Sequence, residues 1–184
     1  MIITVKSIDE AISYSYSKLD KKIAIVSITC LNDSLPNFNT NNENILGILE
    51  LHFNDIERQY GDYEIPKKED FKELKRFIDK YKDVVDEMVV HCHAGISRSS
   101  ATASAICRYL NIDDSFIWDS FMYHPNSLVL KLALEELGIH INSDEIEKLY
   151  KRNEYAHESC PYLKEVEDMF EYNDLGEVTS INLK

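Results

Sequence analysis

The residues from Val89 to Ala101 read VVHCHAGISRSSA and change character twice. They start inside an apolar run, EMVVHC, which is typical of a buried β-strand. A short turn with Gly95 and few bulky side chains follows. The chain then continues as RSSATASAICRYL, whose small residues over helical length predict a helix close against a sheet. Because ligands of α/β proteins bind beyond the carboxyl ends of strands, we expect a ligand at this turn.

The turn between Cys92 and Arg98 has the properties of an anion-binding loop. Backbone N–H groups at the start of a helix point toward a bound anion, and the partial positive charge there attracts it. Arg98 adds a planar, permanently charged side chain that can hold two phosphate oxygens at once. The same positive field favours an ionised thiol, so we expect Cys92 to react as a thiolate beneath a bound phosphorus atom.

The rest of the chain alternates between strand and helix patterns. Apolar and β-branched runs predict further strands at residues 2–5, 22–29 and 45–55. A helix is expected after Ser7, which has the capping-box spacing to Glu10, and another after Pro66. The second helix has one apolar stripe, formed by Phe71, Leu74, Ile78 and Tyr81. The pattern predicts an α/β fold with a central, mostly parallel sheet of about four to five strands flanked by helices.

The C-terminal half has a helical pattern. We expect Asn126 to cap one helix and Gly138 to end it. The predicted helices cover residues 98–110, 113–124, 126–137, 143–157 and 161–172. Since the sequence has no internal repeat and no clear linker, we expect a single domain over residues 1–184. Its motif-bearing part covers about residues 22–138, and a helical C-terminal extension covers residues 139–184.

Composition limits the partners and the location of the protein. The chain has 184 residues, 44% of them apolar, and a formal net charge of −13. Such an acidic protein is not attracted to nucleic acid or to anionic membrane surfaces, so we expect neither as a partner. The sequence starts without the basic and apolar regions of a signal peptide and has no long apolar run, so we expect a cytoplasmic protein. The cysteines are then expected to be reduced: Cys30, Cys92, Cys107 and Cys160.

The stretch HCHAGISRS resembles the signature loop of the cysteine-dependent protein tyrosine phosphatase superfamily, in which His-Cys is followed by five residues and then Arg-Ser or Arg-Thr. The compact, dual-specificity-like and bacterial-type branch is the most similar. LHFNDI at residues 51–56 looks like its acid-bearing loop, and HPNSLVLKLALEELG at residues 124–138 looks like the helix after the signature. The resemblance implies a protein tyrosine phosphatase-like fold. It also implies hydrolysis of phosphate monoesters through a phosphocysteine intermediate, without a metal or another cofactor.

The resemblance also implies a role for each residue of the signature. Cys92 is the nucleophile, and Arg98 binds the phosphoryl oxygens and stabilises the transition state. Ser99 hydrogen-bonds the leaving thiolate, and His91 orients the loop and supports ionisation of the thiol. Backbone amides that bind phosphate, or a similar anion such as sulfate, come from His93, Ala94, Gly95, Ile96 and Ser97.

A phosphatase of this kind also needs a general acid, which protonates the leaving oxygen and later activates water. Asp55 ends an apolar strand and opens a polar loop, as the general acid does in the phosphatase family that the sequence resembles. We therefore expect Asp55 to be the general acid. It lies 37 residues before Cys92, which is more than in most compact members. Asp62 lies 30 residues before Cys92, in QYGDYE, and is the alternative.

The expected substrate is phosphotyrosine in a protein or peptide, and phosphoserine and phosphothreonine stay open as further substrates. The loop has no lysine between Cys92 and Arg98, which disfavours highly charged inositol phosphates. Two other functions also stay open. One is a phosphoprotein-binding module without turnover, and the other is a rhodanese-like sulfurtransferase, which also places a cysteine in an anion-binding loop.

A metal site and a purely structural thiol explain the signature less well. Adjacent residues at a strand end point to opposite sides, and no second group of His or Cys completes four ligands with His91, Cys92 and His93. A cysteine that only packs in the core would leave the presence of Gly95, Arg98 and Ser99 unexplained. We therefore expect no bound metal.

Overall fold

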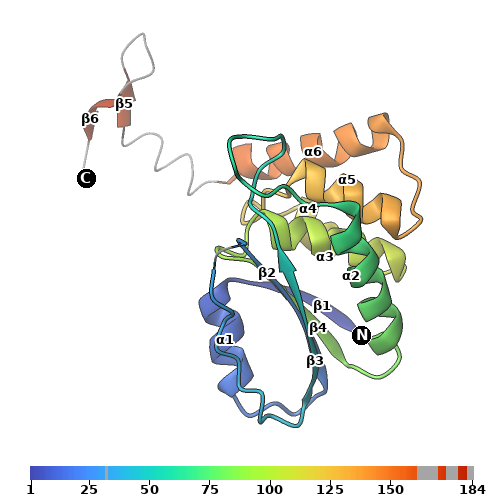
Figure 1. Ribbon diagram of the computed structural model, residues 1–184. Coiled ribbons are helices and arrows are strands. Elements are labelled where there is room, and N and C mark those ends of the chain that lie inside the picture. Colours follow the sequence, from blue (N-terminus) through green and yellow to red (C-terminus); the bar gives the residue numbers. More distant parts are fainter. Residues whose placement is uncertain (32, 161–169, 173–177, 182–184) are drawn as a thin grey trace.

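Four parallel strands form the central sheet of the protein. The computed structural model describes residues 1–31, 33–160, 170–172 and 178–181 (Figure 1). The sheet has the order β1-β4-β2-β3, and all of its pairs are parallel. Its strands are β1 (Ile2–Lys6), β2 (Ile23–Thr29), β3 (Ile45–His52) and β4 (Glu87–His91). The α/β class and the parallel sheet expected from the sequence are therefore confirmed, although β3 ends before Asp55.

Helices cover both faces of this sheet. The helix α1 (Ile8–Tyr16) lies on one face, and its predicted capping box between Ser7 and Glu10 is present. The opposite face is covered by the helices α2 (Lys68–Tyr81) and α3 (Arg98–Tyr109), and α5 (Ser127–Glu136) packs against these two helices (Figure 1). The short helix α4 (Ser115–Trp118) contacts the last helix of this layer, α6 (Ser143–Glu158).

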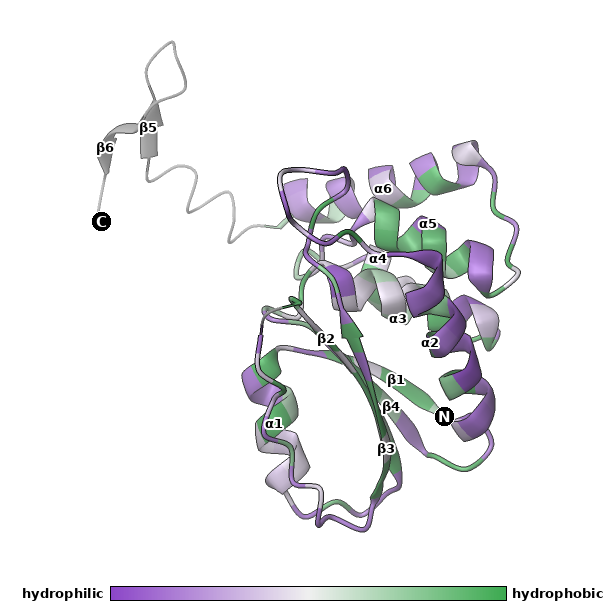
Figure 2. Ribbon diagram, viewed as in Figure 1, coloured by the Kyte–Doolittle hydropathy of each residue, from purple (hydrophilic) through white to green (hydrophobic). Residues whose placement is uncertain are grey.

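Every residue of β2 is buried, because the strand has a helical layer on each side. Successive side chains point to opposite faces. Ala24, Val26 and Ile28 belong to the larger core, which lies under α2, α3 and α5. Ile23 and Ile25 belong to the smaller core with α1. Figure 2 shows the resulting pattern, with apolar strands in the middle and hydrophilic residues along much of α2.

The predicted stripe of α2 faces the core as expected, whereas two predicted helices of the C-terminal half need correction. All four stripe residues of α2 are buried. In residues 113–124 only α4 is helical, because the buried Trp118 is held by Asp114 and Ser104 and the chain then turns toward the signature loop. Of the predicted helix 161–172, residues 161–169 lie outside the described residues.

The end of that last predicted helix is a strand. Phe170–Tyr172 forms β5, which pairs antiparallel with β6 (Val178–Ile181). Aromatic and β-branched residues dominate both segments and favour extended backbone, which the helical interpretation ignored. Among the described residues of the extension, α6 is the helical part, and the single domain over residues 1–184 stays a prediction. No helix in the described ranges has the length and apolar character needed to cross a membrane.

The side chain of Glu87 connects β1 and α1 to β4 in the centre of the sheet. It begins β4 and is only 2% exposed. Its Oε1 accepts a hydrogen bond from Thr4 Oγ1 of β1 at 2.6 Å, and its Oε2 accepts one from Tyr14 of α1 at 2.7 Å and pairs with Lys21 Nζ at 2.9 Å. Burial alone would raise the pKa of Glu87, but the hydrogen bonds from Thr4, Lys21 and Tyr14 outweigh it and leave the pKa below its ordinary value.

Glu87→Ala is expected to lower the free energy of unfolding at neutral pH by about 2 kcal/mol, because the partly buried hydroxyl groups of Thr4 and Tyr14 lose their acceptor. The carboxylate stabilises the folded state above its unfolded-state pKa, and this contribution is lost as the pH falls through the lowered folded-state pKa. Urea denaturation should therefore show a difference between wild type and variant that shrinks in acid. Glu50→Ala removes an exposed carboxylate from β3 and should change stability by less than about 0.5 kcal/mol. A difference for Glu87→Ala that is the same at every pH would contradict this role.

Candidate active site

The signature loop runs from the end of β4 to the start of α3 and rests on the junction of β1 and α1. Gly95 has a φ of 76°, which favours glycine. A Cβ atom at this position would lie 2.7 Å from the backbone of both Lys6 and Ser7, so a larger residue does not fit. The backbone N–H of Ile8 donates to the carbonyl of His93 at 3.1 Å. The loop is therefore held in place by its contacts with the end of β1 and the start of α1.

The backbone donors of this loop are unused. Within the part of the chain that the structure describes, none of the backbone N–H groups of residues 93–97 donates a hydrogen bond to protein. Ser97 stands at the N-cap of α3, but its side chain makes no capping hydrogen bond. These N–H groups, together with the start of α3, are thus available to an anion.

The thiol of Cys92 lies at the base of the loop. Cys92 is 2% exposed, and its Sγ is 3.1 Å from the hydroxyl oxygen of the fully buried Ser99. His91 is also fully buried, and its Nδ1 is 3.3 Å from the carbonyl oxygen of Cys92. Burial lowers the pKa of His91 to about 4, so the imidazole is neutral at pH 7 and Nδ1 donates to that carbonyl. His91 can therefore orient the loop, but it supplies no positive charge to the thiol.

Arg98 presents one free edge to the loop. The residue is 5% exposed. Its Nη1 donates to the carbonyl of Phe53 at 2.8 Å and to Cys30 Sγ at 3.6 Å. Its Nε is buried without a hydrogen-bond partner among the described residues, and Nη2 donates no hydrogen bond to them either. One edge of the guanidinium is thus held by protein, and the Nε–Nη2 edge can take two oxygens of an anion.

Asp55 lies beside the same loop. Its Oδ1 accepts hydrogen bonds from the Ser97 hydroxyl and from Asn126 Nδ2, each at 2.8 Å. Its Oδ2 is 3.9 Å from Arg98 Nε, and its side chain is 37% exposed. The structure therefore brings the predicted acid together with the signature, although the two are far apart in the sequence.

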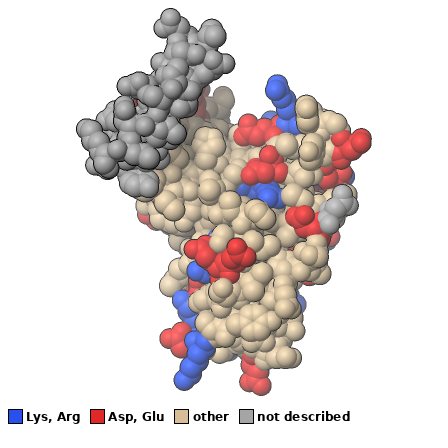
Figure 3. Space-filling view, turned by 90° about the vertical axis from the view of Figure 1, so that its left-hand side faces the viewer, with Lys and Arg blue, Asp and Glu red and all other residues tan. Residues whose placement is uncertain are grey.

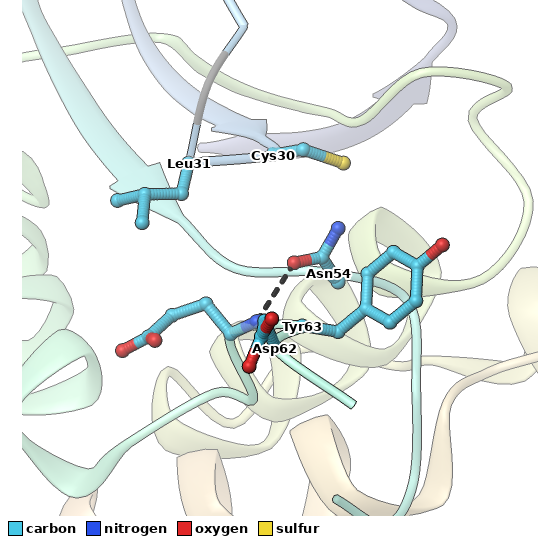
Figure 4. A pocket seen from close by; sticks show the side chains of 6 residues that line it. Cys30, Leu31, Asn54, Asp62 and Tyr63 are labelled. Carbon is cyan, nitrogen blue, oxygen red and sulfur yellow. Dashed lines mark hydrogen bonds between the residues drawn. The ribbon is translucent and has the colours of Figure 1, made fainter. Parts of the chain in front are cut away.

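Asp62 lies in a neighbouring pocket of about 350 Å³. In Figure 4, Cys30 and Leu31 lie on one side of this pocket and Asn54, Asp62 and Tyr63 on the other. Asn54 Oδ1 accepts a hydrogen bond from the backbone of Glu64 at 3.0 Å, which closes the loop that carries Asp62 (Figure 4). Among the described residues, Asp62 makes no hydrogen bond or ion pair with the signature loop, whereas Asp55 contacts Ser97 and Arg98 of that loop.

Asn126 is the site residue that the sequence pattern did not reveal. Its predicted role as an N-cap is confirmed, because its Oδ1 accepts from the backbone N–H of Val129 at 3.0 Å. The same side chain also donates to Asp55, and its backbone N–H donates to the carbonyl of Ser97 at 3.3 Å. The Asn126 side chain carries both a donor and an acceptor, and this is the only feature of the sequence that could have suggested a contact besides the N-cap.

Arg98 is the one Lys or Arg in the signature stretch HCHAGISRS. On the face seen in Figure 3, acidic and basic side chains of the described residues are interspersed, without a continuous basic strip. In the same described ranges, no group of three His, Cys, Asp or Glu side chains gathers to hold a metal ion. An anion at the signature loop would therefore depend on Arg98 and on the backbone amides.

The comparison with known proteins identifies the fold. No protein-family model and no curated protein matches the sequence. The structure is similar to that of the human tyrosine phosphatase-like serine/threonine/tyrosine-interacting protein, with 22% identity and a TM-score of 0.54 over 72% of this chain and 89% of that chain. The chain has the tyrosine phosphatase-like fold. The fold expected from the signature is thereby confirmed.

Two further structures match with lower scores. Human DUSP28 is 11% identical, with a TM-score of 0.41 over 86% of this chain and 95% of that chain. The core catalytic domain of the PP-IP phosphatase SIW14 from S. cerevisiae, solved in complex with citrate, is 15% identical, with a TM-score of 0.39 over 83% of this chain and 87% of that chain. The tyrosine phosphatase-like fold assignment does not depend on these two.

Proposed function

We propose that this protein is a cysteine-dependent phosphatase of the protein tyrosine phosphatase superfamily that hydrolyses phosphotyrosine in proteins or peptides. Phosphoserine and phosphothreonine are further candidate substrates. One observation carries the proposal: the buried thiol of Cys92, the unused amides of residues 93–97 and the free edge of Arg98 belong to one loop. That combination suits a phosphate group held directly against a nucleophile.

The proposed reaction has two steps, and the positions of Cys92, Asp55 and Ser99 are compatible with both. The Cys92 thiolate attacks phosphorus, so that a P–S bond forms while the P–O bond to the leaving group breaks. Asp55 donates its proton to the leaving oxygen. In the second half, the Asp55 carboxylate takes a proton from water, whose oxygen attacks phosphorus and releases the thiolate. The Ser99 hydroxyl, 3.1 Å from Sγ, donates a hydrogen bond to that leaving thiolate.

The remaining residues bind the phosphoryl group and keep the loop in shape. The amides of residues 93–97 and the Nε–Nη2 edge of Arg98 hold the three phosphoryl oxygens, whose charge grows in the transition state. Neutral His91 fixes the carbonyl of Cys92 through its Nδ1 proton. None of these steps requires a metal or another cofactor.

The depth of Cys92 supports phosphotyrosine as the preferred substrate. Because the residue is 2% exposed, the phosphate group must enter the loop before it meets the thiol. A tyrosine ring is a longer and more rigid stem than the side chain of serine or threonine. The absence of lysine between Cys92 and Arg98 argues against inositol phosphates with many charges.

The proposal is tested by hydrolysis of para-nitrophenyl phosphate between pH 5 and pH 8, with EDTA present. We expect turnover near or below neutral pH that EDTA does not change and that inorganic phosphate inhibits competitively. Phosphate binding without any turnover would favour the phosphoprotein-binding module instead. Transfer of sulfur from thiosulfate to cyanide, without phosphate hydrolysis, would favour the sulfurtransferase.

Asp55→Ala tests the assignment of the general acid. We expect kcat for phenyl phosphate, a poor leaving group, to fall roughly 100-fold, because the phenolate then leaves without a proton. The loss with para-nitrophenyl phosphate should be clearly smaller, since para-nitrophenolate leaves more easily. Asp62→Ala is the matched control and should change either rate by less than about twofold. If Asp62→Ala alone shows the dependence on the leaving group, Asp55 is not the acid.

A further inference from the structure

Asn126 makes three contacts at the point where the acid loop, the signature loop and α5 meet. Its Nδ2 donates to Asp55 Oδ1, its Oδ1 caps α5 at Val129, and its backbone N–H donates to Ser97. The residue is 5% exposed. We propose that Asn126 is a positioning residue that determines which oxygen of Asp55 carries the proton. This inference rests on the proposed phosphatase function, with Asp55 as its acid.

The cap fixes the orientation of the Asn126 amide. An amide side chain can be turned over so that its oxygen and nitrogen exchange places. Here the oxygen must face the backbone N–H of Val129, which can only donate, at 3.0 Å. The NH₂ group is consequently directed at Asp55, where it can only donate. The start of α5 thus determines the hydrogen-bonding character that Asp55 meets.

The two hydrogen bonds to Oδ1 of Asp55 favour protonation of its other carboxyl oxygen, Oδ2. Oδ1 of Asp55 already accepts from Asn126 and from the Ser97 hydroxyl, each at 2.8 Å. A proton on Oδ1 would compete with these donors for the same lone pairs, so protonation favours Oδ2. Oδ2 is the oxygen that faces Arg98, at 3.9 Å from Nε. The acidic proton is thereby held on the side where the phosphoryl group binds.

The chain around Asn126 is itself held from both sides. Toward the signature loop, the backbone N–H of His124 donates to the carbonyl of Ile96 at 3.1 Å. Toward α6, the Tyr150 hydroxyl donates to the carbonyl of Pro125 at 2.9 Å, and its ring contacts Trp118 edge-on at 5.3 Å. Burial raises the pKa of Tyr150, so its hydroxyl keeps the proton that this bond needs. Asn126 therefore meets Asp55 from a fixed position.

Asn126→Ser separates the cap from the contact with Asp55. Serine is a good N-cap and should preserve α5, but its shorter side chain provides no amide for Asp55. We expect kcat/KM for phenyl phosphate to fall about 10-fold, while kcat/KM for para-nitrophenyl phosphate changes by less than about threefold. In an Asp55→Ala background, Asn126→Ser should have no further effect beyond about twofold, because both changes act on one proton transfer.

Asn142→Ser is the matched control. Asn142 caps α6 in the same way, with its Oδ1 accepting from the backbone N–H of Glu145 at 2.9 Å, and it has no contact with Asp55. This variant should hydrolyse both substrates like the wild type. Circular dichroism and thermal unfolding of each variant will show that the caps still hold.

The outcomes separate this inference from the function on which it rests. A wild-type protein that hydrolyses neither substrate would overturn both. An active wild type, with Asn126→Ser losing the same factor on both substrates, would overturn only the role of Asn126. Losses from Asn126→Ser and Asp55→Ala that multiply in the double variant would do the same, since Asn126 would then act without Asp55.

Discussion

Cys92→Ser is expected to lower kcat for para-nitrophenyl phosphate by roughly 10⁴-fold or more, because the nucleophile is lost. A serine hydroxyl is not ionised near neutral pH. Its neighbour at 3.1 Å, the hydroxyl of Ser99, cannot take its proton as a base would. The amides of residues 93–97 and Arg98 are unchanged, so inorganic phosphate should bind with its affinity altered by less than about threefold. Steady-state kinetics and calorimetric titration with phosphate measure the two quantities.

Cys107→Ala is the control for this experiment. Cys107 is a fully buried thiol on α3, and burial, together with the charges of Asp114 and Asp113, raises its pKa to about 12. It therefore stays protonated and unreactive, and its removal should leave kcat within about twofold of the wild-type value. Turnover by Cys92→Ser above about 1% of wild type would mean that another group is the nucleophile.

Arg98→Lys is expected to reduce kcat/KM by about 10³-fold, although the charge is kept. Lysine is a point charge and cannot present a planar edge to two phosphoryl oxygens. It also cannot at the same time replace the hydrogen bond from Nη1 to the carbonyl of Phe53, at 2.8 Å. Because Phe53 lies two residues before Asp55, this substitution releases the acid loop as well as the phosphate. Kinetics with para-nitrophenyl phosphate and phenyl phosphate measure both effects.

The matched control is Arg108→Lys on the same helix. Arg108 Nε pairs with Asp114 at 2.7 Å, away from the signature loop. We expect this variant to retain kcat/KM within about twofold of wild type. A value for Arg98→Lys within tenfold of wild type would show that bidentate binding by Arg98 contributes little to the reaction.

Much of the fold could be predicted from the sequence, because the informative features are local. The capping box at Ser7, the stripe of α2 and the largely apolar, β-branched run of β2 each depend on neighbouring residues in the chain. The same holds for the strand, turn and helix around Cys92. Gly95 could be placed in the turn, but its close approach to Lys6 depends on how β1 and β4 lie together.

The details of the site depend on tertiary contacts that no local pattern contains. The sequence pattern predicts Asp55 at the end of a strand, but β3 already ends at His52. The chain turns away there, because the carbonyl of Phe53 accepts a hydrogen bond from Arg98 and the backbone N–H of Asn54 donates to the carbonyl of Glu64. Its contact with Asn126 joins residues that are 71 positions apart. The neutral state of His91 comes from burial, which also depends on the packed structure.

The place of β1 at the edge of the sheet has a consequence for folding during synthesis. Among the described strands, β1 pairs only with β4, so Ile2 has no strand partner until Glu87 has been made. At translation rates of about 5–20 residues per second, roughly 4 to 17 s pass between the synthesis of Ile2 and that of Glu87. Gly95 and the signature loop rest on the end of this strand. Although β1 leaves the ribosome first, it is therefore expected to join the sheet last. A nascent chain should bind phosphate only after its β1 has paired with β4.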